Sequence, residues 1–447
     1  MELPTKNPLA LADPIPSPLS TGSPAPAAPP IPPPPPAPPR SSTRTNSRVY
    51  TIFLLLNSMI GSGVFNMPHV FSRVGLVSAY CMLTVAALFI YAGLVFLVAV
   101  SAAGGGGDCS DYSSLAVRVM GGAWAGHVVD ASIVVIGLGS LLSYLAAITG
   151  TVTLLLSSWG SSAAPLAVTS ALVACVVFPL CLQRFYGHFS GISVVSMLSV
   201  SGVLVLVGGP LYAQQYEGAS PRSEEQQSPT LVVGDPLSQL GSVVFTLSCA
   251  SAAFHTFRYM RERSLAEWRS VAAWTVGAGW TLCALMGTGG ALTFRNHTNG
   301  IILNNFRRGH VADFFQLLFV LHLVLYIPLD FLVARHSLLR LAGVPGGAFA
   351  SQWQHVLLCA VLLAAPTALI FWGAARGMDS GAAFSVVLNI SGGLGGSVVS
   401  FVLPAALYLK QRPEIGGRPA LAFAVLMLLA GLVVSVYVPV ITVSTAL

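Results

Sequence analysis

The chain has 447 residues, of which 21 are Lys or Arg and 15 are Asp or Glu, so charged residues make up 8% and the net charge is +6. Soluble domains carry about 25% charged residues, whereas 54% of this chain is hydrophobic and its mean hydropathy is +0.77. These values exclude a soluble enzyme, a nucleic-acid reader and a secreted disulfide scaffold. Apolar stretches of roughly 20 residues instead predict an all-α polytopic membrane protein.

Residues 1–47 are predicted to form a disordered, proline-rich cytoplasmic tail. The first 40 residues hold 16 of the 30 prolines, including the run Pro32 to Pro36. Such a segment buries little apolar surface and favours polyproline II conformation. The run is a candidate docking site for an SH3-type domain; the alternative is a solvated tail without a partner.

Residues 48–447 are predicted to form one transmembrane domain. Eleven apolar spans lie near 50–71, 75–101, 127–156, 164–182, 190–212, 238–256, 271–293, 313–334, 355–373, 381–408 and 420–443. With the N-terminus in the cytoplasm, the inner segments carry fifteen Lys and Arg and the outer segments six. This excess predicts a cytoplasmic N-terminus. A glycosylation sequon at Asn296 then falls on the outer side, in agreement.

The first span is predicted to be a broken helix. Gly61-Ser62-Gly63 lies at mid-span, and in lipid a break is tolerated only where it lines a cavity within the protein. Backbone N–H groups of Ser62, Gly63 and Val64 would then face an anion such as a carboxylate. Carbonyls of the preceding half-helix, with the Asn57 amide, would hold a cation. The alternative is close helix packing through small residues.

A second interruption falls in the sixth span. The stretch from Ser248 to His255 contains small and polar residues at mid-depth. Interruptions in spans one and six are typical of a transporter built from an inverted repeat of five plus five helices, with its binding site near the midplane.

Several motifs resemble those of the amino acid/auxin permease superfamily, most of all its sodium-coupled neutral amino acid transporter branch. The resemblance covers residues 48–443. The matching residues are Asn57-Ser58 and Gly61-Ser62-Gly63, Ser143-Tyr144-Leu145, Pro328 with Arg335, and the stretch from Ser400 to Lys410.

This resemblance implies a LeuT-type five-plus-five inverted repeat with broken helices 1 and 6, and import of small neutral amino acids by alternating access. It assigns Gly61-Ser62-Gly63 to the substrate carboxylate and Asn57 to a coupling sodium ion. It further implies that Cys249, Ala250 and Ser251 line the pocket for the substrate side chain and amine. For Tyr144 the alternatives are a gate or substrate contact and a packed aromatic.

The eighth span departs from the sodium-coupled pattern. Residues 311–334 contain no Ser or Thr and offer Val324 and Tyr326 instead, so one oxygen ligand for a hard cation is missing. The same span contains His322 and Asp330, and ionisable residues at membrane depth often relay protons. The candidate ion-coupling residues are therefore Asn57, Tyr326, His322 and Asp330. The alternatives are a hydrogen-bonded neutral His322 and a local Asp330–Arg335 ion pair.

The sequence therefore predicts a secondary active transporter of neutral L-amino acids, with sodium or a proton as the coupling ion and no other cofactor. The alternative is a membrane receptor that senses an amino acid with little transport. The expected partners are the amino acid and the bilayer, and not nucleic acid. Outer loops 213–237 and 294–312 lack the cysteines of the branch's extracellular disulfide, so both a plasma-membrane and a vacuolar or endolysosomal location are retained.

Overall fold

The computed structural model describes residues 46–103, 111–183, 202, 235–306, 309–344, 351–412 and 417–446. All of them belong to the compact unit formed by residues 44–447. The predicted tail, apart from its last two residues, and the predicted span at 190–212, apart from residue 202, lie outside these ranges. Both stay predictions.

The described elements of the first part of the chain are helical. In chain order they are α1 (Arg48–Met59), the 3-10 helix η1 (Ser62–Asn66), α2 (Met67–Val74), α3 (Leu76–Ala103), α4 (Tyr112–Met120), α5 (Ala123–Ser158), α6 (Pro165–Leu172), the π-helical turn η2 (Val173–Val177) and α7 (Phe178–Cys181).

The later elements are helical as well. They are η4 (Pro236–Gln239), α10 (Leu240–Leu247), η5 (Ala250–Ala252), α11 (Ala253–Arg258), α12 (Leu265–Phe294), η6 (Arg295–His297), η7 (Ile302–Asn305), α13 (His310–Leu341), α14 (Gln352–Ala375), α15 (Ser380–Ser391), the π-helical turns η9 (Gly392–Gly396) and η10 (Val398–Val402), α16 (Leu403–Gln411) and α17 (Gly417–Ala446).

Among the described residues, eight helices are long and apolar enough to cross a membrane, and the bent pair of α1 and η1–α2 makes a ninth. This confirms a polytopic helical membrane protein. The predicted span at 164–182 is a shorter apolar helix, Pro165–Cys181. The count of eleven and the inverted repeat of five plus five helices are not established by these helices and stay predictions.

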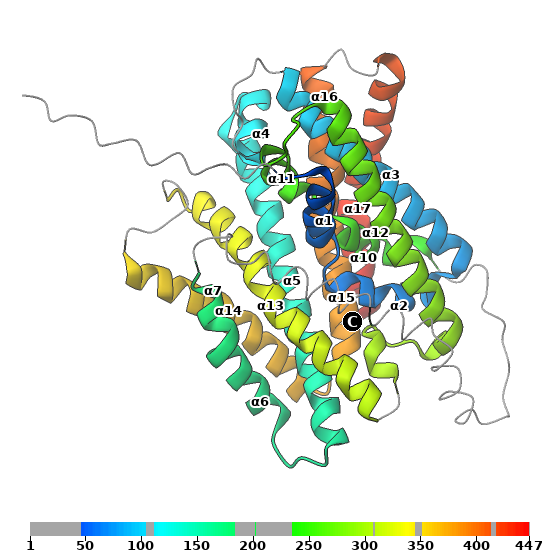
Figure 1. The fold of residues 1–447 in the computed structure, drawn as a ribbon, viewed down its shortest axis with the longest axis vertical. Coiled ribbons are helices and arrows are strands. Elements are labelled where there is room, and N and C mark those ends of the chain that lie inside the picture. Colours follow the sequence, from blue (N-terminus) through cyan, green and yellow to red (C-terminus); the bar gives the residue numbers. More distant parts are fainter. Residues whose placement is uncertain are drawn as a thin grey trace, which may run out of the picture. The chain divides into compact units, whose positions relative to one another are not determined.

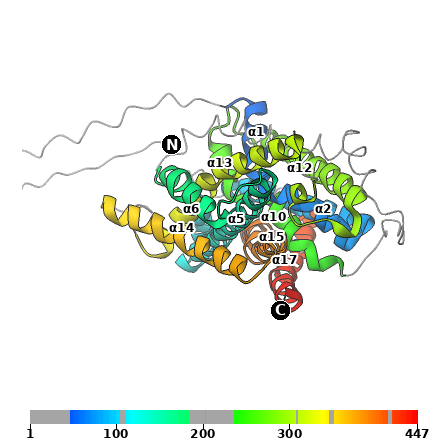
Figure 2. The same cartoon turned by 90° about the horizontal axis from the view of Figure 1, so that it is seen from below.

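Helix α5 lies at the centre of the described bundle. It packs against α13 and α15 along its length, with α6 and α14 on one flank, while α12 packs against α3, α2 and α1 (Figures 1 and 2). The most apolar window of α5 is 72% buried, against 28% for α17. Because helices that are apolar on every side need either protein or lipid around them, α17 faces lipid and α5 faces protein.

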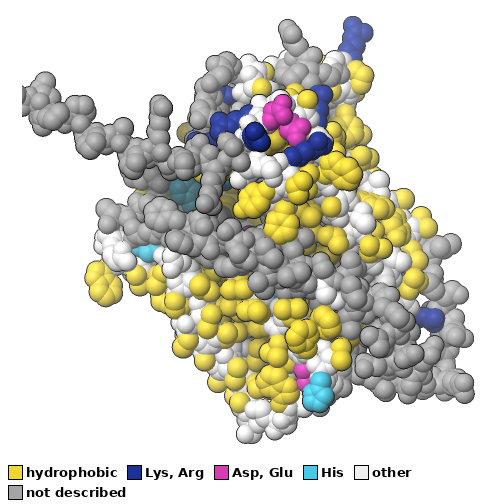
Figure 3. Space-filling view, viewed as in Figure 1, with side chains coloured by type: hydrophobic (Ala, Val, Ile, Leu, Met, Phe, Trp, Pro, Cys, Tyr) yellow, Lys and Arg dark blue, Asp and Glu magenta, His cyan; other side chains and the backbone are white. Residues whose placement is uncertain are grey.

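On the face drawn in Figure 3, most of the charged side chains lie at the end of the bundle where α1 begins, which we call the α1 end. Figure 3 shows hydrophobic side chains along the helices, and Lys, Arg, Asp and Glu side chains gathered around the start of α1 and α12. Arg261, Glu262, Arg263 and Arg269 are exposed in this charged region. A charged end next to apolar helix surfaces, which we call the charged cap, is what a boundary between water and lipid requires.

Two contacts tie the first broken helix to the second at the α1 end. The Asn46 N–H donates to the Tyr259 carbonyl at 2.6 Å, and the Arg261 N–H donates to the Asn46 carbonyl at 3.1 Å. Arg48 also pairs with Glu267 at the start of α12, with 3.3 Å between the charged groups. The start of α1 is therefore joined to the end of α11.

An ion cluster joins α4, α5 and α13. Arg340 of α13 pairs with Asp111 at 3.1 Å and with the buried Asp130 of α5, and it donates to the Ser113 hydroxyl at 2.9 Å. Burial alone would raise the pKa of Asp111, but the Ser114 N–H and the Arg340 charge lower it overall, below its ordinary value. Asp111 therefore adds stability above its ordinary pKa and loses that contribution as the pH falls through the lowered value.

Asp130→Asn is expected to lower the free energy of unfolding by about 2 kcal/mol, because the carboxylate of a largely buried pair is removed beside an arginine that is partly exposed. Thermal unfolding of the purified chain in detergent measures this change. Asp111→Asn is the matched control, since its carboxylate is more exposed, and a loss below about 1 kcal/mol is expected. Equal losses in both variants would contradict the assignment of Asp130 as the main partner.

Candidate functional site

The first helix is broken where the sequence predicts. Helix α1 ends at Met59 and the half-helix Ser62–Val74 continues at an angle of 56°. All residues from Met59 to Phe65 are buried. The first N–H groups of a helix lack partners within it, so those at the start of Ser62–Val74 are directed toward the break.

Close packing explains why glycines flank this break. A Cβ atom at Gly63 would lie 2.9 Å from the Cβ of Thr246 in α10 and 3.1 Å from its Cα. A Cβ at Gly61 would lie 3.1 Å from the Tyr144 hydroxyl oxygen and 3.6 Å from the ring of Tyr326. The break therefore lies between α10 on one side and α5 and α13 on the other. Thr246 was not predicted, although it directly precedes the small and polar stretch of the sixth span.

The sixth span is also interrupted. Ser248 ends α10 in an extended conformation, and its hydroxyl lies 2.9 Å from that of Ser400. Cys249 and Ala250 are buried and Ser251 is partly buried. The turn η5 packs against α3 and η10, whereas η1 packs against α10. The interruption is confirmed, and the assignment of these three residues to the substrate pocket stays a prediction.

Asn57 and Tyr326, both assigned to ion coupling, are brought together. The Tyr326 hydroxyl donates to the Asn57 backbone carbonyl at 2.6 Å, and both residues are buried. This carbonyl belongs to the end of α1 that the sequence assigned to a cation. The Tyr326 hydroxyl therefore contacts an oxygen that a sodium ion would use as a ligand. Residues 311–334, which include Tyr326, offer no Ser or Thr hydroxyl as a further ligand.

Asp330 contacts α5 rather than its own helix. The Tyr144 hydroxyl donates to the Asp330 carboxylate at 2.8 Å. Arg335 instead donates to the Cys181 carbonyl at 2.8 Å. The predicted Asp330–Arg335 pair is wrong, because residues five apart on a helix lie about 140° apart around its axis.

His322 is fully buried and lies on the side of α13 that faces the break. Its ring centre is 5.5 Å from that of Tyr326 and 6.0 Å from that of Phe65. Neither of its nitrogens has a hydrogen-bond partner among the described residues, and the same holds for the buried Ser62 hydroxyl. The alternative of a hydrogen-bonded His322 thus finds no protein partner within the described ranges and stays a prediction. Each unsatisfied buried group costs about 1–3 kcal/mol, which a polar ligand would recover.

We call the residues gathered around this interruption the break site: Asn57, Gly61, Ser62, Gly63, Val64, Tyr144, Thr246, His322 and Tyr326. The structure brings Tyr144, Tyr326 and His322 to the break, and their functional roles stay predictions. Asn296 lies in η6, and its glycosylation stays a prediction.

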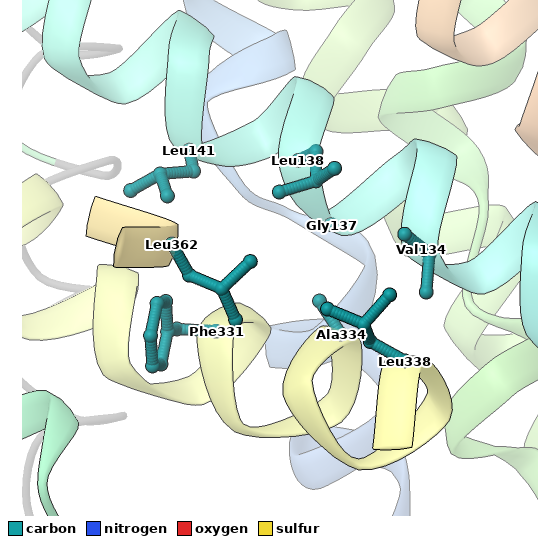
Figure 4. A pocket seen from close by; sticks show the side chains of 8 residues that line it. All are labelled: Val134, Gly137, Leu138, Leu141, Phe331, Ala334, Leu338 and Leu362. Atoms are coloured by element: carbon teal, nitrogen blue, oxygen red, sulfur yellow. The ribbon is translucent and has the colours of Figure 1, made fainter. Parts of the chain in front are cut away.

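Two other kinds of site are weaker candidates within the described ranges. No group of three or more His, Cys, Asp or Glu in these ranges is placed to hold a metal ion. A pocket between α5, α13 and α14 (Figure 4) is lined by Val134, Gly137, Leu138, Leu141, Phe331, Ala334, Leu338 and Leu362. Its side chains offer no polar group for a charged ligand, so the break site is the better candidate.

Comparisons with known proteins match this chain to one family over most of its length. The family model for transmembrane amino acid transporter proteins matches residues 44–445. The chain is 25% identical to a putative sodium-coupled neutral amino acid transporter 11 of Danio rerio over 86% of this chain and 83% of that protein. It is 23% identical to the protein of the same name from Rattus norvegicus, over 88% of this chain and 84% of that protein. Vacuolar amino acid transporter 2 of Saccharomyces cerevisiae is 24% identical to this chain over 36% of this chain and 33% of that protein.

Gly63→Ala is expected to lower the free energy of unfolding by about 1–3 kcal/mol, because the added methyl group meets the backbone of Thr246. Thermal unfolding of the purified chain measures the loss. Gly277→Ala in α12 is the matched control, since a Cβ there has no neighbour within 4 Å, and it is expected to be neutral or slightly stabilising. Equal stability of the two variants would show that η1 and α10 do not pack as described.

Proposed function

Because this chain belongs to the transmembrane amino acid transporter family, we propose that it moves neutral L-amino acids across a membrane by alternating access, driven by a sodium or a proton gradient. The observation that carries the proposal is the buried break between α1 and the half-helix Ser62–Val74. The names of the relatives from Danio rerio and Rattus norvegicus support neutral amino acids as substrates, and they do not favour a receptor that senses without transport.

The break site suits an amino acid in chemical terms. The N–H groups at the start of Ser62–Val74 offer donors to a carboxylate, and the helix dipole favours negative charge there. The Ser62 hydroxyl and the His322 ring add polar groups that lack partners among the described residues. A zwitterion with a small neutral side chain satisfies these groups without adding net charge to the membrane interior.

Alternating access requires the bundle to open, because the residues around the break are buried. At the α1 end, α1 is held to the segment after α11 by the Asn46 backbone bonds and by the Arg48–Glu267 pair. The Arg48 side chain is 45% exposed, and exposed pairs contribute about 0–1 kcal/mol. These contacts are weak enough to separate in each transport cycle.

The orientation that we propose places the N-terminus and the α1 end in the cytoplasm. The excess of Lys and Arg in segments on that side supports it, as does the charged cap in Figure 3. One relative is named as a vacuolar amino acid transporter, which supports a vacuolar or endolysosomal location, and the plasma membrane stays the other alternative.

The purified chain in proteoliposomes is expected to accumulate at least one labelled amino acid from a panel that includes L-alanine and L-glutamine. Uptake is compared under a sodium gradient, a proton gradient and neither, and exchange of labelled for unlabelled substrate is measured in parallel. If sodium is the coupling ion, Asn57→Ala is expected to change the ion dependence more than the choice of substrate, because the Asn57 amide would be one of its ligands. Absence of both uptake and exchange for every substrate would overturn the proposed function.

A further inference from the structure

We propose that Asp330 is the proton-binding site of this chain, and that the Tyr144 hydroxyl controls it by moving its hydrogen bond from Asp330 to the carboxylate of the bound amino acid. Substrate binding and protonation of Asp330 then occur together. This inference rests on the proposed function and names the coupling ion and the residue that carries it.

The position of the Tyr144 hydroxyl is the first observation. Tyr144 is 1% exposed, and its hydroxyl donates to the Asp330 carboxylate at 2.8 Å. The same oxygen lies against Gly61, where a Cβ atom would be only 3.1 Å away. One hydroxyl therefore lies between an acidic side chain of α13 and the backbone of the break, within reach of a carboxylate bound there.

The surroundings of Asp330 are the second observation. The ion pairs found in the described part of the chain join Arg48 to Glu267 and Arg340 to Asp111 and Asp130, so none of them involves Asp330. A carboxylate without a cation is costly inside a membrane. The anion of Asp330 therefore depends on neutral donors, of which the Tyr144 hydroxyl is the one with a hydrogen bond in the described part of the chain.

Other titratable groups near α13 have their own partners or lie elsewhere. Arg335 on α13 donates to the Cys181 and Gln183 carbonyls and to the Cys359 thiol. Asp130 on α5 is held by Arg340, and His127 on α5 and Cys175 on η2 are exposed. His355 on α14 lies 3.2 Å from the Leu182 carbonyl. Tyr326 lies about one turn and His322 about two turns from Asp330 along α13, toward its start. Tyr144 is therefore the titratable group in direct contact with Asp330.

The exchange of partners couples the two events. When a substrate carboxylate binds at Gly61-Ser62-Gly63, it accepts the Tyr144 hydrogen bond, and the Asp330 anion loses a donor. The anion then takes one proton from the solution on the open side and becomes a neutral carboxylic acid. Release of the substrate on the other side returns the hydroxyl to Asp330, which gives up the proton there. Each cycle moves one zwitterionic amino acid and one proton, and therefore one net positive charge.

The contact between Tyr326 and Asn57 fits the same mechanism. The Tyr326 hydroxyl donates to the Asn57 carbonyl at 2.6 Å, where the resemblance to sodium-coupled transporters places the cation. The hydrogen of the Tyr326 hydroxyl, which carries a partial positive charge, lies against the Asn57 carbonyl oxygen where a sodium ion would otherwise bind. Coupling to a proton at Asp330 does not need a sodium ion there.

The test uses the full chain in proteoliposomes that contain a pH-sensitive dye, with labelled L-alanine and L-glutamine as probes. In the native chain, addition of the transported probe is expected to acidify the interior, and gradient-driven uptake is expected to depend on pH. Asp330→Asn is expected to abolish acidification and to reduce gradient-driven accumulation at least about tenfold, while exchange of labelled for unlabelled substrate remains measurable and no longer depends on pH. The Asn side chain keeps a hydrogen-bond acceptor for Tyr144 but cannot take up a proton.

Asp313→Asn is the matched control, because Asp313 lies on the same helix and accepts hydrogen bonds from Ser158 and Trp159. It is expected to keep both acidification and pH dependence. Tyr144→Phe is expected to raise the KM of exchange about tenfold through loss of the hydrogen bond to the substrate carboxylate, and to remove its pH dependence.

Each contrary outcome has a distinct meaning. Substrate-evoked acidification in Asp330→Asn would overturn the inference, as would the same loss in Asp313→Asn. Uptake by the native chain that follows a sodium gradient without proton movement would also overturn it and leave the proposed function standing. A native chain that neither accumulates nor exchanges any probe would overturn the proposed function itself.

Discussion

The break in the first helix depends on one constraint: polar backbone groups inside a membrane need partners from the protein. An interruption at Ile60 and Gly61 is therefore stable only where other helices surround it. Here α10 approaches through Thr246, and α5 and α13 approach through Tyr144 and Tyr326. The position of α5 at the centre of the bundle, and its long contact with α13, follow the same need.

Around this break, hydrogen bonds from tyrosines connect separate helices. Tyr326 joins α13 to the end of α1, and Tyr144 joins α5 to α13 beside Gly61. At the α1 end, the connection between α1 and α11 uses backbone bonds and an exposed ion pair. The ion cluster of Arg340 is more deeply buried and holds α4, α5 and α13 together. Strong contacts thus lie between α5 and α13, and weaker ones hold α1.

Local patterns in the sequence were sufficient to predict both interruptions, because glycine and small polar residues at mid-span are a local signal. Contacts between distant segments were not accessible in this way. Tyr144 and Asp330 lie 186 positions apart, and no spacing rule pairs them. The nearby Arg335 was the natural partner in sequence, but the helix turns it toward the end of α7. Nor does the sequence show that the Phe65 and Tyr326 rings lie next to His322.

An experimental structure of the full chain in lipid nanodiscs, with and without the amino acid that gives the highest uptake, tests the central claim most directly. The account predicts substrate density at the start of the half-helix Ser62–Val74, with its carboxylate against the N–H groups there and within hydrogen-bond distance of the Tyr144 hydroxyl. The distance between Tyr144 and Asp330 should increase from 2.8 Å when the substrate is bound. Substrate density away from this break, or a Tyr144–Asp330 contact that is unchanged by the substrate, would contradict it.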